Sequence, residues 1–246
     1  MDSNIIEGRN PVIEALKSGR EIDKILVTKG NKEGSIKKII GMAKEKKILI
    51  QYVERNKLDQ ISTANSHQGV IAYVAAYKYY EVEEILESAK NSGEDVLLMI
   101  LDEITDPHNL GSVIRTVNAA GGHGVIIPKR RSVGLTATVA KTSAGAIEYV
   151  PVAKVTNLAR TIDYLKNQGV WVVGADMDGE NVHYDSNLTG NVAIVIGSEG
   201  KGISRLIKEK CDFLVRLPMK GQVSSLNASV AASILMYEAL RQRESK

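Results

Sequence analysis

The sequence predicts an α/β protein built around a mainly parallel sheet, on three observations. Hydrophobic residues make up 43% and charged residues 25% of its 246 positions, a balance that supports a buried core and excludes intrinsic disorder. From residue 94 onward, short uninterrupted runs of Val, Ile and Leu recur, which is typical of parallel strands buried on both faces. Helical patterns separate these runs, so strands and helices are expected to alternate.

The first 76 residues predict a smaller α/β domain. Asn10 before Pro11 indicates the start of a helix that Gly19 ends. The further elements expected here are strands over 25–28, 48–53 and 69–76 and a helix over 35–46. Between Lys17 and Lys57, 12 Lys or Arg residues stand against 5 Asp or Glu residues. This local excess of positive charge favours a role in binding a polyanion.

Residues 77–93 change in composition from Tyr-rich to acidic and are expected to form a linker, helical over 82–89. Residues 94–246 form the second expected domain. Its strands are expected over 96–101, 125–127, 149–152, 170–175, 192–196 and 213–217. Its helices are expected over 110–120, 158–168, 203–208 and 228–241.

Ligands of open α/β sheets bind beyond the carboxyl ends of the strands, so the segments that follow the predicted strands are the candidate sites. After the apolar run at 96–101, Asn109 is expected to cap a helix that carries Arg115. After the run at 192–196 comes Gly197-Ser198-Glu199-Gly200-Lys201-Gly202. Its glycines let a ligand approach the backbone closely, and their amides can surround an anion.

The third segment follows the strand predicted over 213–217. Leu217-Pro218 begins a bend, and Ser224 or Ser225 is expected to cap the last helix, whose free amides can hold polar atoms of a ligand. Taken singly, each of the three segments also has a purely structural interpretation, as a helix cap, a tight turn or a closely packed helix.

Several other chemistries lack their patterns. The sequence contains no G-x-x-x-x-G-K-[ST] phosphate loop, no G-x-G-x-x-G after a strand, no H-x-x-x-H pair and no G-x-S-x-G nucleophile turn. Asp176 and Asp178 are interpreted as polar loop residues. The single Cys211 excludes an intramolecular disulfide and a Cys-based zinc site, and it fits the reducing cytoplasm. No apolar stretch predicts a secretory signal or a membrane span.

In this order, the three segments resemble the signature motifs of the SpoU (TrmH) family of RNA ribose 2'-O-methyltransferases, in the SPOUT superfamily. The resemblance covers residues 95–243 and includes a further similar segment at 142–146. It implies catalytic roles for Asn109, Arg115, Glu199, Ser225 and Asn227. It implies backbone contacts to S-adenosylmethionine from Gly197, Leu217 and Leu226.

The same resemblance implies a parallel sheet with a deep C-terminal trefoil knot that binds the cofactor, a homodimer and no metal. Near the N-terminus, Glu7-Gly8-Arg9-Asn10-Pro11 and His67-Gln68-Gly69-Val70 are similar to the substrate-binding domain of the RlmB-type branch, which has a ribosomal-protein-L30e-like fold. Members of that branch methylate a guanosine ribose in 23S rRNA, so this RNA is the implied substrate and partner.

Three alternatives stay open. The same methyl transfer could act on tRNA or on another rRNA nucleotide, which the sequence does not separate. A non-catalytic RNA-binding assembly factor is disfavoured by the intact set of five motif residues. A nucleotide-dependent oxidoreductase lacks its glycine fingerprint.

Overall fold

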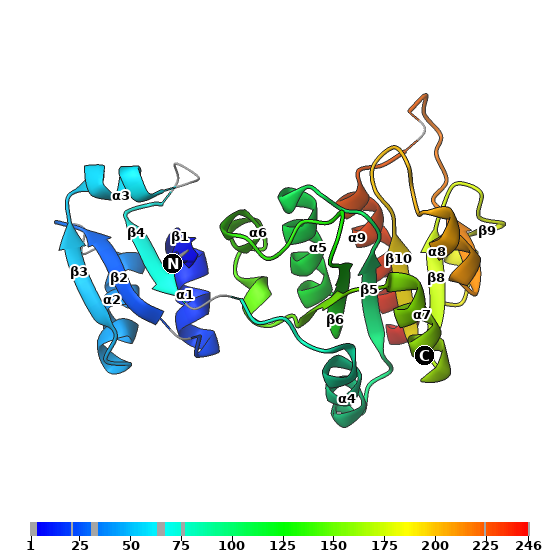
Figure 1. Ribbon diagram of the computed structural model, residues 1–246, viewed down its shortest axis with the longest axis horizontal. Helices are drawn as coiled ribbons and strands as arrows, with labels where there is room; N and C mark the ends of the chain where they lie inside the picture. The colour runs from blue at the N-terminus through cyan, green and yellow to red at the C-terminus, as the bar shows by residue number, and fades with distance from the viewer. Residues whose placement is uncertain are drawn as a thin grey trace. The chain divides into compact units, whose positions relative to one another are not determined.

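The computed structural model describes residues 4–20, 22–30, 34–62, 67–74, 77–223 and 225–245 (Figure 1). The chain folds into two compact units. The first comprises Met1–Lys78 and Leu135–Tyr149, and the second comprises Tyr79–Gly134 and Val150–Lys246.

The first unit contains a four-stranded sheet in the order β1-β4-β2-β3. Its strands are β1 (Asn4–Glu7), β2 (Ile22–Thr28), β3 (Leu49–Val53) and β4 (Val70–Val74), and its helices include α1 (Arg9–Ser18), α2 (Ser35–Glu45) and α3 (Arg55–Ile61). Strand β4 runs antiparallel to β1 and β2, whereas β2 and β3 are parallel. Strands β1, β2 and β3 therefore all end at the edge of the sheet where β4 begins.

Helix α1 (Arg9–Ser18) begins two residues earlier than expected. Its N-cap is Gly8 and not Asn10, and Gly8 has a φ of 96°, a backbone conformation that favours glycine. Gly19 ends the helix in the left-handed conformation, as predicted. Strand β1 and helix α3 were not expected, because segments of four and seven residues are too short to show a clear hydrophobic period.

Residues 135–149 lie in the first unit, although they fall within the second expected domain. This segment forms α6 (Ala137–Thr142) and the 3₁₀-helix η1 (Ala146–Glu148), which pack against β1 and α1. Arg20 donates a hydrogen bond to Glu148 at 2.9 Å, and both side chains are almost fully buried. The guanidinium of Arg20 also lies 3.4 Å from the centroid of the Tyr77 ring. A buried ion pair stacked on an aromatic ring therefore fixes the segment in place.

The second unit contains a seven-stranded, fully parallel sheet in the order β7-β6-β5-β10-β8-β11-β9. Its strands are β5 (Leu97–Leu101), β6 (Gly124–Pro128), β7 (Val152–Val155), β8 (Trp171–Ala175), β9 (Asn181–Val182), β10 (Val192–Ile196) and β11 (Phe213–Arg216). Strands β5 and β10 are buried at every residue, which confirms the parallel sheet predicted from the apolar runs.

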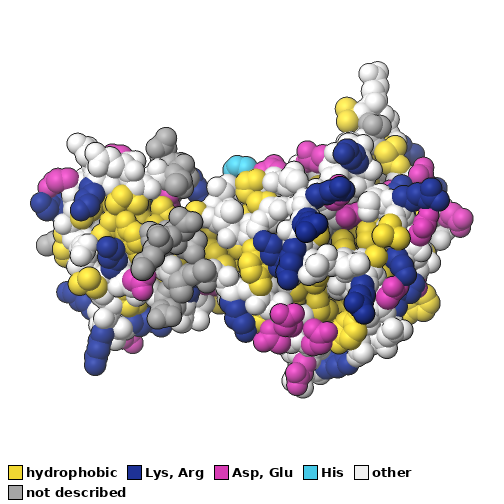
Figure 2. All heavy atoms as spheres, viewed as in Figure 1, with side chains coloured by type: hydrophobic (Ala, Val, Ile, Leu, Met, Phe, Trp, Pro, Cys, Tyr) yellow, Lys and Arg dark blue, Asp and Glu magenta, His cyan; other side chains and the backbone are white. Residues whose placement is uncertain are grey.

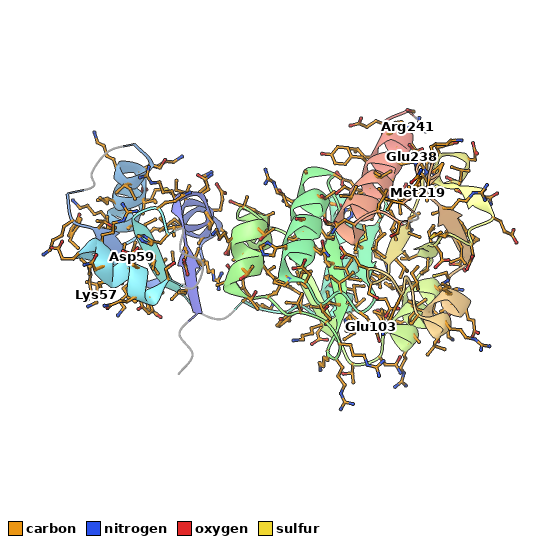
Figure 3. All side chains as sticks on the ribbon, turned by 90° about the horizontal axis from the view of Figure 1, so that it is seen from above. Lys57, Asp59, Glu103, Met219, Glu238 and Arg241 are labelled. Atoms are coloured by element: carbon orange, nitrogen blue, oxygen red, sulfur yellow. The ribbon has the colours of Figure 1, made fainter. Side chains whose placement is uncertain are left out.

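Helices cover both faces of this sheet. They are α4 (Val82–Ser92), α5 (Pro107–Ala119), α7 (Leu158–Asn167), α8 (Arg205–Lys210) and α9 (Ala228–Glu244), with the 3₁₀-helix η2 (His183–Asp185). One core cluster joins α4, α7 and α8 to the strands. Helices α5 and α9 pack against each other, and Figure 3 shows the sheet between this pair and α7 with α8. The unit is therefore a three-layer α/β/α structure.

The predicted linker contributes to the core of the second unit. Its helix, α4, buries Val82, Ile85, Leu86 and Ala89 against the sheet, and its exposed glutamates form the acidic group of side chains over α4 in Figure 2. Cys211 packs against the same cluster, and burial raises the pKa of its thiol to about 12. A half-buried thiol of this kind acts as a small apolar side chain.

Strand β7 spans Val152–Val155, three residues later than predicted, because Tyr149 still belongs to the turn that ends η1. Within the described parts of the chain, no helix is both long and apolar enough to cross a bilayer. Among the same residues, no three His, Cys, Asp or Glu side chains group closely enough to hold a metal ion.

Candidate active site

A cavity of about 400 Å³ lies at the carboxyl ends of β8, β10 and β11. Its walls come from the loop 197–202, from residues 175–178, from α8 and from the segment that leads into α9. The predicted residues that line it are Gly197, Glu199, Leu217, Ser225 and Leu226. Five of the eight predicted site residues thus surround one cavity, at the edge of the sheet where ligands of α/β proteins bind.

The loop after β10 closes tightly on itself. The Ser198 amide donates to the Gly202 carbonyl at 3.1 Å, and the Gly202 amide donates to the Ser198 carbonyl at 2.8 Å. A Cβ atom on Gly197 would lie 2.0 Å from the Gly202 carbonyl carbon, so only glycine fits at position 197. The cavity wall here is therefore backbone, which leaves peptide groups available to a ligand.

Three predicted residues meet beside this loop. The Asn109 amide donates to Oε1 of Glu199 at 3.0 Å, and the Asn227 amide donates to Oδ1 of Asn109 at 2.9 Å. Asn227 also donates to Oε1 of Glu199. Asn109 is buried, whereas Glu199 and Asn227 are exposed. The trio joins the loop after β10 to the starts of α5 and α9.

Both helix caps differ from those expected from the sequence. Asp106, and not Asn109, is the N-cap of α5, because its carboxylate accepts the His108 amide at 2.8 Å. Asn109 lies in the first turn, which frees its side chain to reach Glu199. Helix α9 is capped by Asn227, whose Oδ1 accepts the amides of Ser229 and Val230. Ser225 lies before the cap and lines the cavity, and Ser224 lies outside the described residues.

Arg115 is separate from the trio. It lies six residues after Asn109 on α5, which corresponds to about 9 Å along the helix axis and a rotation of about 240°. Its side chain is exposed and forms no hydrogen bond or ion pair with the described part of the chain. The structure of one chain therefore brings together seven of the eight predicted residues and leaves Arg115 apart.

One ionic pair at the cavity was not expected from the sequence. Oδ2 of Asp176 lies 2.6 Å from Nζ of Lys208, and only 7% of the Asp176 side chain is exposed. Hydrogen bonding to Asp176 is the main cause that raises the pKa of Lys208 above its ordinary value. Asp176 follows directly after β8. The carboxyl end of a parallel strand is where ligands bind, so this position indicated a site residue, although Asp176 was interpreted as a polar loop residue. The pair offers both signs of charge to a ligand.

The comparison with known families decides the classification. Residues 96–237, more than half of the chain, match the model described as the SpoU rRNA Methylase family. The chain belongs to the SpoU rRNA methylase family. Residues 5–80 match a second model, described as RNA 2'-O ribose methyltransferase substrate binding. Family membership confirms the class of enzyme predicted from the sequence, an RNA methyltransferase that uses S-adenosylmethionine.

Individual relatives agree with this classification. The chain is 55% identical over 238 residues to YacO of Bacillus subtilis (strain 168), which is assigned to the TrmH family of tRNA/rRNA methyltransferases; the match covers 96% of this chain and 94% of YacO. It resembles the crystal structure of the SpoU methyltransferase AviRb from Streptomyces viridochromogenes with a TM-score of 0.84 and 25% identity, over 99% of this chain and 90% of AviRb. A second AviRb structure, solved with AdoMet, has a TM-score of 0.83 at 24% identity over 98% and 91% of the two chains. These matches confirm the SPOUT-type α/β fold.

Proposed function

We propose that this SpoU rRNA methylase family member methylates the ribose 2'-oxygen of a guanosine in 23S rRNA. The observation that carries the proposal is the cavity at the carboxyl edge of the second sheet, where Asn109, Glu199 and Asn227 meet beside a glycine loop. The choice of RNA rests on the first unit, where residues 5–80 match a substrate-binding family and carry motifs similar to the 23S rRNA branch. We place the reaction in the cytoplasm, whose reducing conditions suit a single free thiol.

The residues around the cavity fit S-adenosylmethionine. A volume of about 400 Å³ lies within the ordinary range for cofactor sites, and both peptide groups and apolar side chains line it. Gly197, Leu217 and Leu226 would hold the adenosine part, and Asp176 with Lys208 suits the zwitterionic amino-acid part. The loop 197–202 and the residues Leu217, Met219, Ser225 and Leu226 border this cavity, where the family resemblance implies a knotted connection. When bound, the cofactor supplies a methyl group activated on a sulfonium.

The ribose 2'-hydroxyl must lose its proton when it is methylated, and water or a phosphate oxygen would accept that proton. Arg115 is not the base, because a guanidinium stays protonated at physiological pH. We assign it to bind the phosphate next to the ribose and to stabilise the developing negative charge. Asn109, Glu199, Ser225 and Asn227 orient the ribose.

The proposed enzyme is a homodimer through α9. Val230, Ile234 and Tyr237 lie at helical spacing on this helix and are 45%, 36% and 50% exposed. Exposed apolar side chains in such a stripe indicate a protein interface. Helix α5, which carries Arg115, packs beside α9. A dimer through this face would bring Arg115 next to the second copy, and we propose that Arg115 completes the site of that copy.

Labelled methyl transfer to unmodified 23S rRNA and, separately, to unmodified tRNA tests the function. We expect incorporation into 23S rRNA, reduced by about 100-fold in Arg115→Ala, the scale of losing one transition-state donor. Arg115→Lys keeps the charge but not the bidentate geometry and should lose at least about tenfold. Arg160→Lys, at an exposed arginine on α7, is the matched control.

Other outcomes of the same assay are informative. Activity of Arg115→Lys within a fewfold of wild type would contradict the proposed role of the guanidinium. Transfer to tRNA alone would preserve the mechanism and replace the substrate. Cofactor binding without transfer to either naked RNA would shift the assay to a precursor of the large ribosomal subunit.

A further inference from the structure

Two short segments of the first unit, far apart in the sequence, meet at one edge of its sheet. Arg9 follows β1, and Gln68 and Gly69 precede β4. The Arg9 amide donates to Oε1 of Gln68 at 3.1 Å, and Nε of Arg9 donates to the Gln68 carbonyl at 3.1 Å. These residues belong to the two N-terminal motifs at 7–11 and 67–70, and the methyl-transfer site described above uses neither motif.

A cavity of about 480 Å³ opens at this edge. Its lining residues are Arg9, Thr28, Arg55, Gln68 and Gly69. Thr28 ends β2 and Arg55 follows β3, so the cavity lies beyond the carboxyl ends of parallel strands, where α/β sheets bind their ligands. Two of the lining side chains are cationic and none is anionic, which makes the cavity suited to an anion.

The turn that forms one wall is held in place from several sides. His67 is 2% exposed, its Nε2 lies 2.9 Å from Oδ1 of Asp59, and its Nδ1 accepts the Gly69 amide at 3.0 Å. Figure 3 labels Asp59 on α3. The Gly69 carbonyl accepts the Thr28 amide at 3.0 Å, and Gln68 adopts a φ of 52°, which is unfavourable for a residue with a side chain. The wall is therefore rigid before any ligand arrives.

Donor groups remain available at the cavity. The only side-chain donor that Arg9 uses within the described residues is Nε, and Arg55 forms no hydrogen bond or ion pair with that part of the chain. Two guanidiniums with open donors suit a phosphodiester. The volume exceeds what a phosphate alone would fill, and proteins that read RNA by sequence or shape take up nucleotides that are unpaired and splayed out.

We propose that this cavity binds one unpaired nucleotide of the RNA substrate, with its phosphate on Arg9 and Arg55. The proposal rests on the proposed function and adds to it a second RNA contact, away from the methyl-transfer site. The cavity would let the enzyme distinguish an RNA loop from a continuous helix, since a base stacked within a duplex is not free to enter it.

The test measures binding of the full chain to a fluorescein-labelled RNA hairpin with an unpaired loop, and to a fully paired RNA duplex of the same length, by anisotropy at several salt concentrations. Arg55→Gln is the decisive variant, because Arg55 is exposed and supports no other contact in the described structure. Arg9→Gln also removes a contact that holds the turn, so its thermal unfolding is recorded in parallel. Lys90→Gln, at the end of α4 in the second unit, is the charge-matched control.

For Arg55→Gln we expect about tenfold weaker binding to the hairpin and less than about twofold weaker binding to the duplex. The slope of log affinity against log salt should decrease by about 0.7, the value for one phosphate contact on a single strand. Arg55→Lys should restore the slope without restoring the full affinity. Lys90→Gln should match wild type.

Unchanged hairpin binding by Arg55→Gln, or an equal loss on hairpin and duplex, would overturn the proposal. The two proposals fail separately. If wild type binds the hairpin in an Arg55-dependent way but transfers no methyl group to any RNA, the proposed function fails and the cavity proposal stands. If methyl transfer occurs and Arg55→Gln binds like wild type, only the cavity proposal fails.

Discussion

At the scale of the residue, His123 shows how a partly buried base makes stability depend on pH. Its Nδ1 accepts the Leu97 amide at 3.1 Å, and Nε2 lies 3.6 Å from Oε2 of Glu94. Burial is the main cause that lowers the pKa of His123 below its ordinary value of 6.5. The folded chain therefore holds the neutral ring, and the stability from this group is present above pH 6.5 and decreases as the pH falls further.

We expect the free energy of unfolding to be lower at pH 5.5 than at pH 7.5, and His123→Gln to show a smaller difference. Chemical denaturation of wild type and variant at the two pH values measures this. His108→Gln, at an exposed histidine, should keep the wild-type difference. An unchanged difference in His123→Gln would assign the pH dependence to other groups.

Single residues also show why part of the site could be predicted from the sequence. Gly197 and Glu199 were identified because a strand and its following loop are contiguous in the sequence. Asn109 contacts Glu199, but its expected role as the cap of α5 was wrong, since a cap depends on which of several nearby polar side chains turns toward the free amides. The pairing of Asp176 with Lys208 joins the segment after β8 to helix α8, and no local sequence pattern indicates which partner Asp176 finds.

At the scale of the element, Asn227 gives α9 two functions, because it caps the helix and also contacts Asn109 and Glu199. Asn157 caps α7 in the same way, accepting the Arg160 amide at 3.0 Å, and has no contact with the site trio. We expect Asn227→Ala and Asn157→Ala each to reduce the free energy of unfolding by about 1 kcal/mol. Only Asn227→Ala should also reduce methyl transfer, by about tenfold or more.

Denaturation curves and transfer rates of the two variants, measured side by side, separate stability from function. Equal activity losses would mean that Asn227 acts only through the stability of its helix. The matched pair is informative because both substitutions remove the same chemical group from the same helix position.

Helices and strands could be predicted where burial in the core determines their pattern of hydrophobic residues. The long apolar strands of the second sheet were found because both of their faces are buried, whereas β1, α3 and α6 are too short for their period to be read. Helix α4 was expected, but its membership in the core was not. The acidic residues of its exposed face give α4 the composition of a linker. The burial of Ile85 and Leu86 depends on the sheet against which α4 packs.

At the scale of the whole molecule, the assignment of residues 135–149 to the first unit could not have been predicted from the sequence. The segment joins that unit through the buried pair of Arg20 and Glu148, which are 128 residues apart. Pairing at such separations is decided by tertiary packing and leaves no periodic signal. The separation of Arg115 from Asn109, by contrast, follows from their six-residue spacing along the predicted helix.

That separation leads to a prediction about the proposed dimer. If Arg115 of one copy completes the site of the other, each active site combines Arg115 from one chain with Glu199 from its partner. Arg115→Ala and Glu199→Ala dimers should both be inactive. In a mixed dimer of the two variants, one site loses both residues and the other regains both. Random exchange makes half of all dimers mixed, so an equal mixture should recover about a quarter of the wild-type activity.

The measurement is methyl transfer by each variant alone and by the two after they are unfolded and refolded together. Adding Ile234→Glu to both chains places a charge in the exposed apolar stripe of α9 and should abolish the recovery, because the chains would stay monomeric. Leu206→Glu, at an apolar residue that is 57% exposed on α8, should leave it intact. No recovery in mixtures shown by mass to contain mixed dimers would mean that Arg115 serves its own chain.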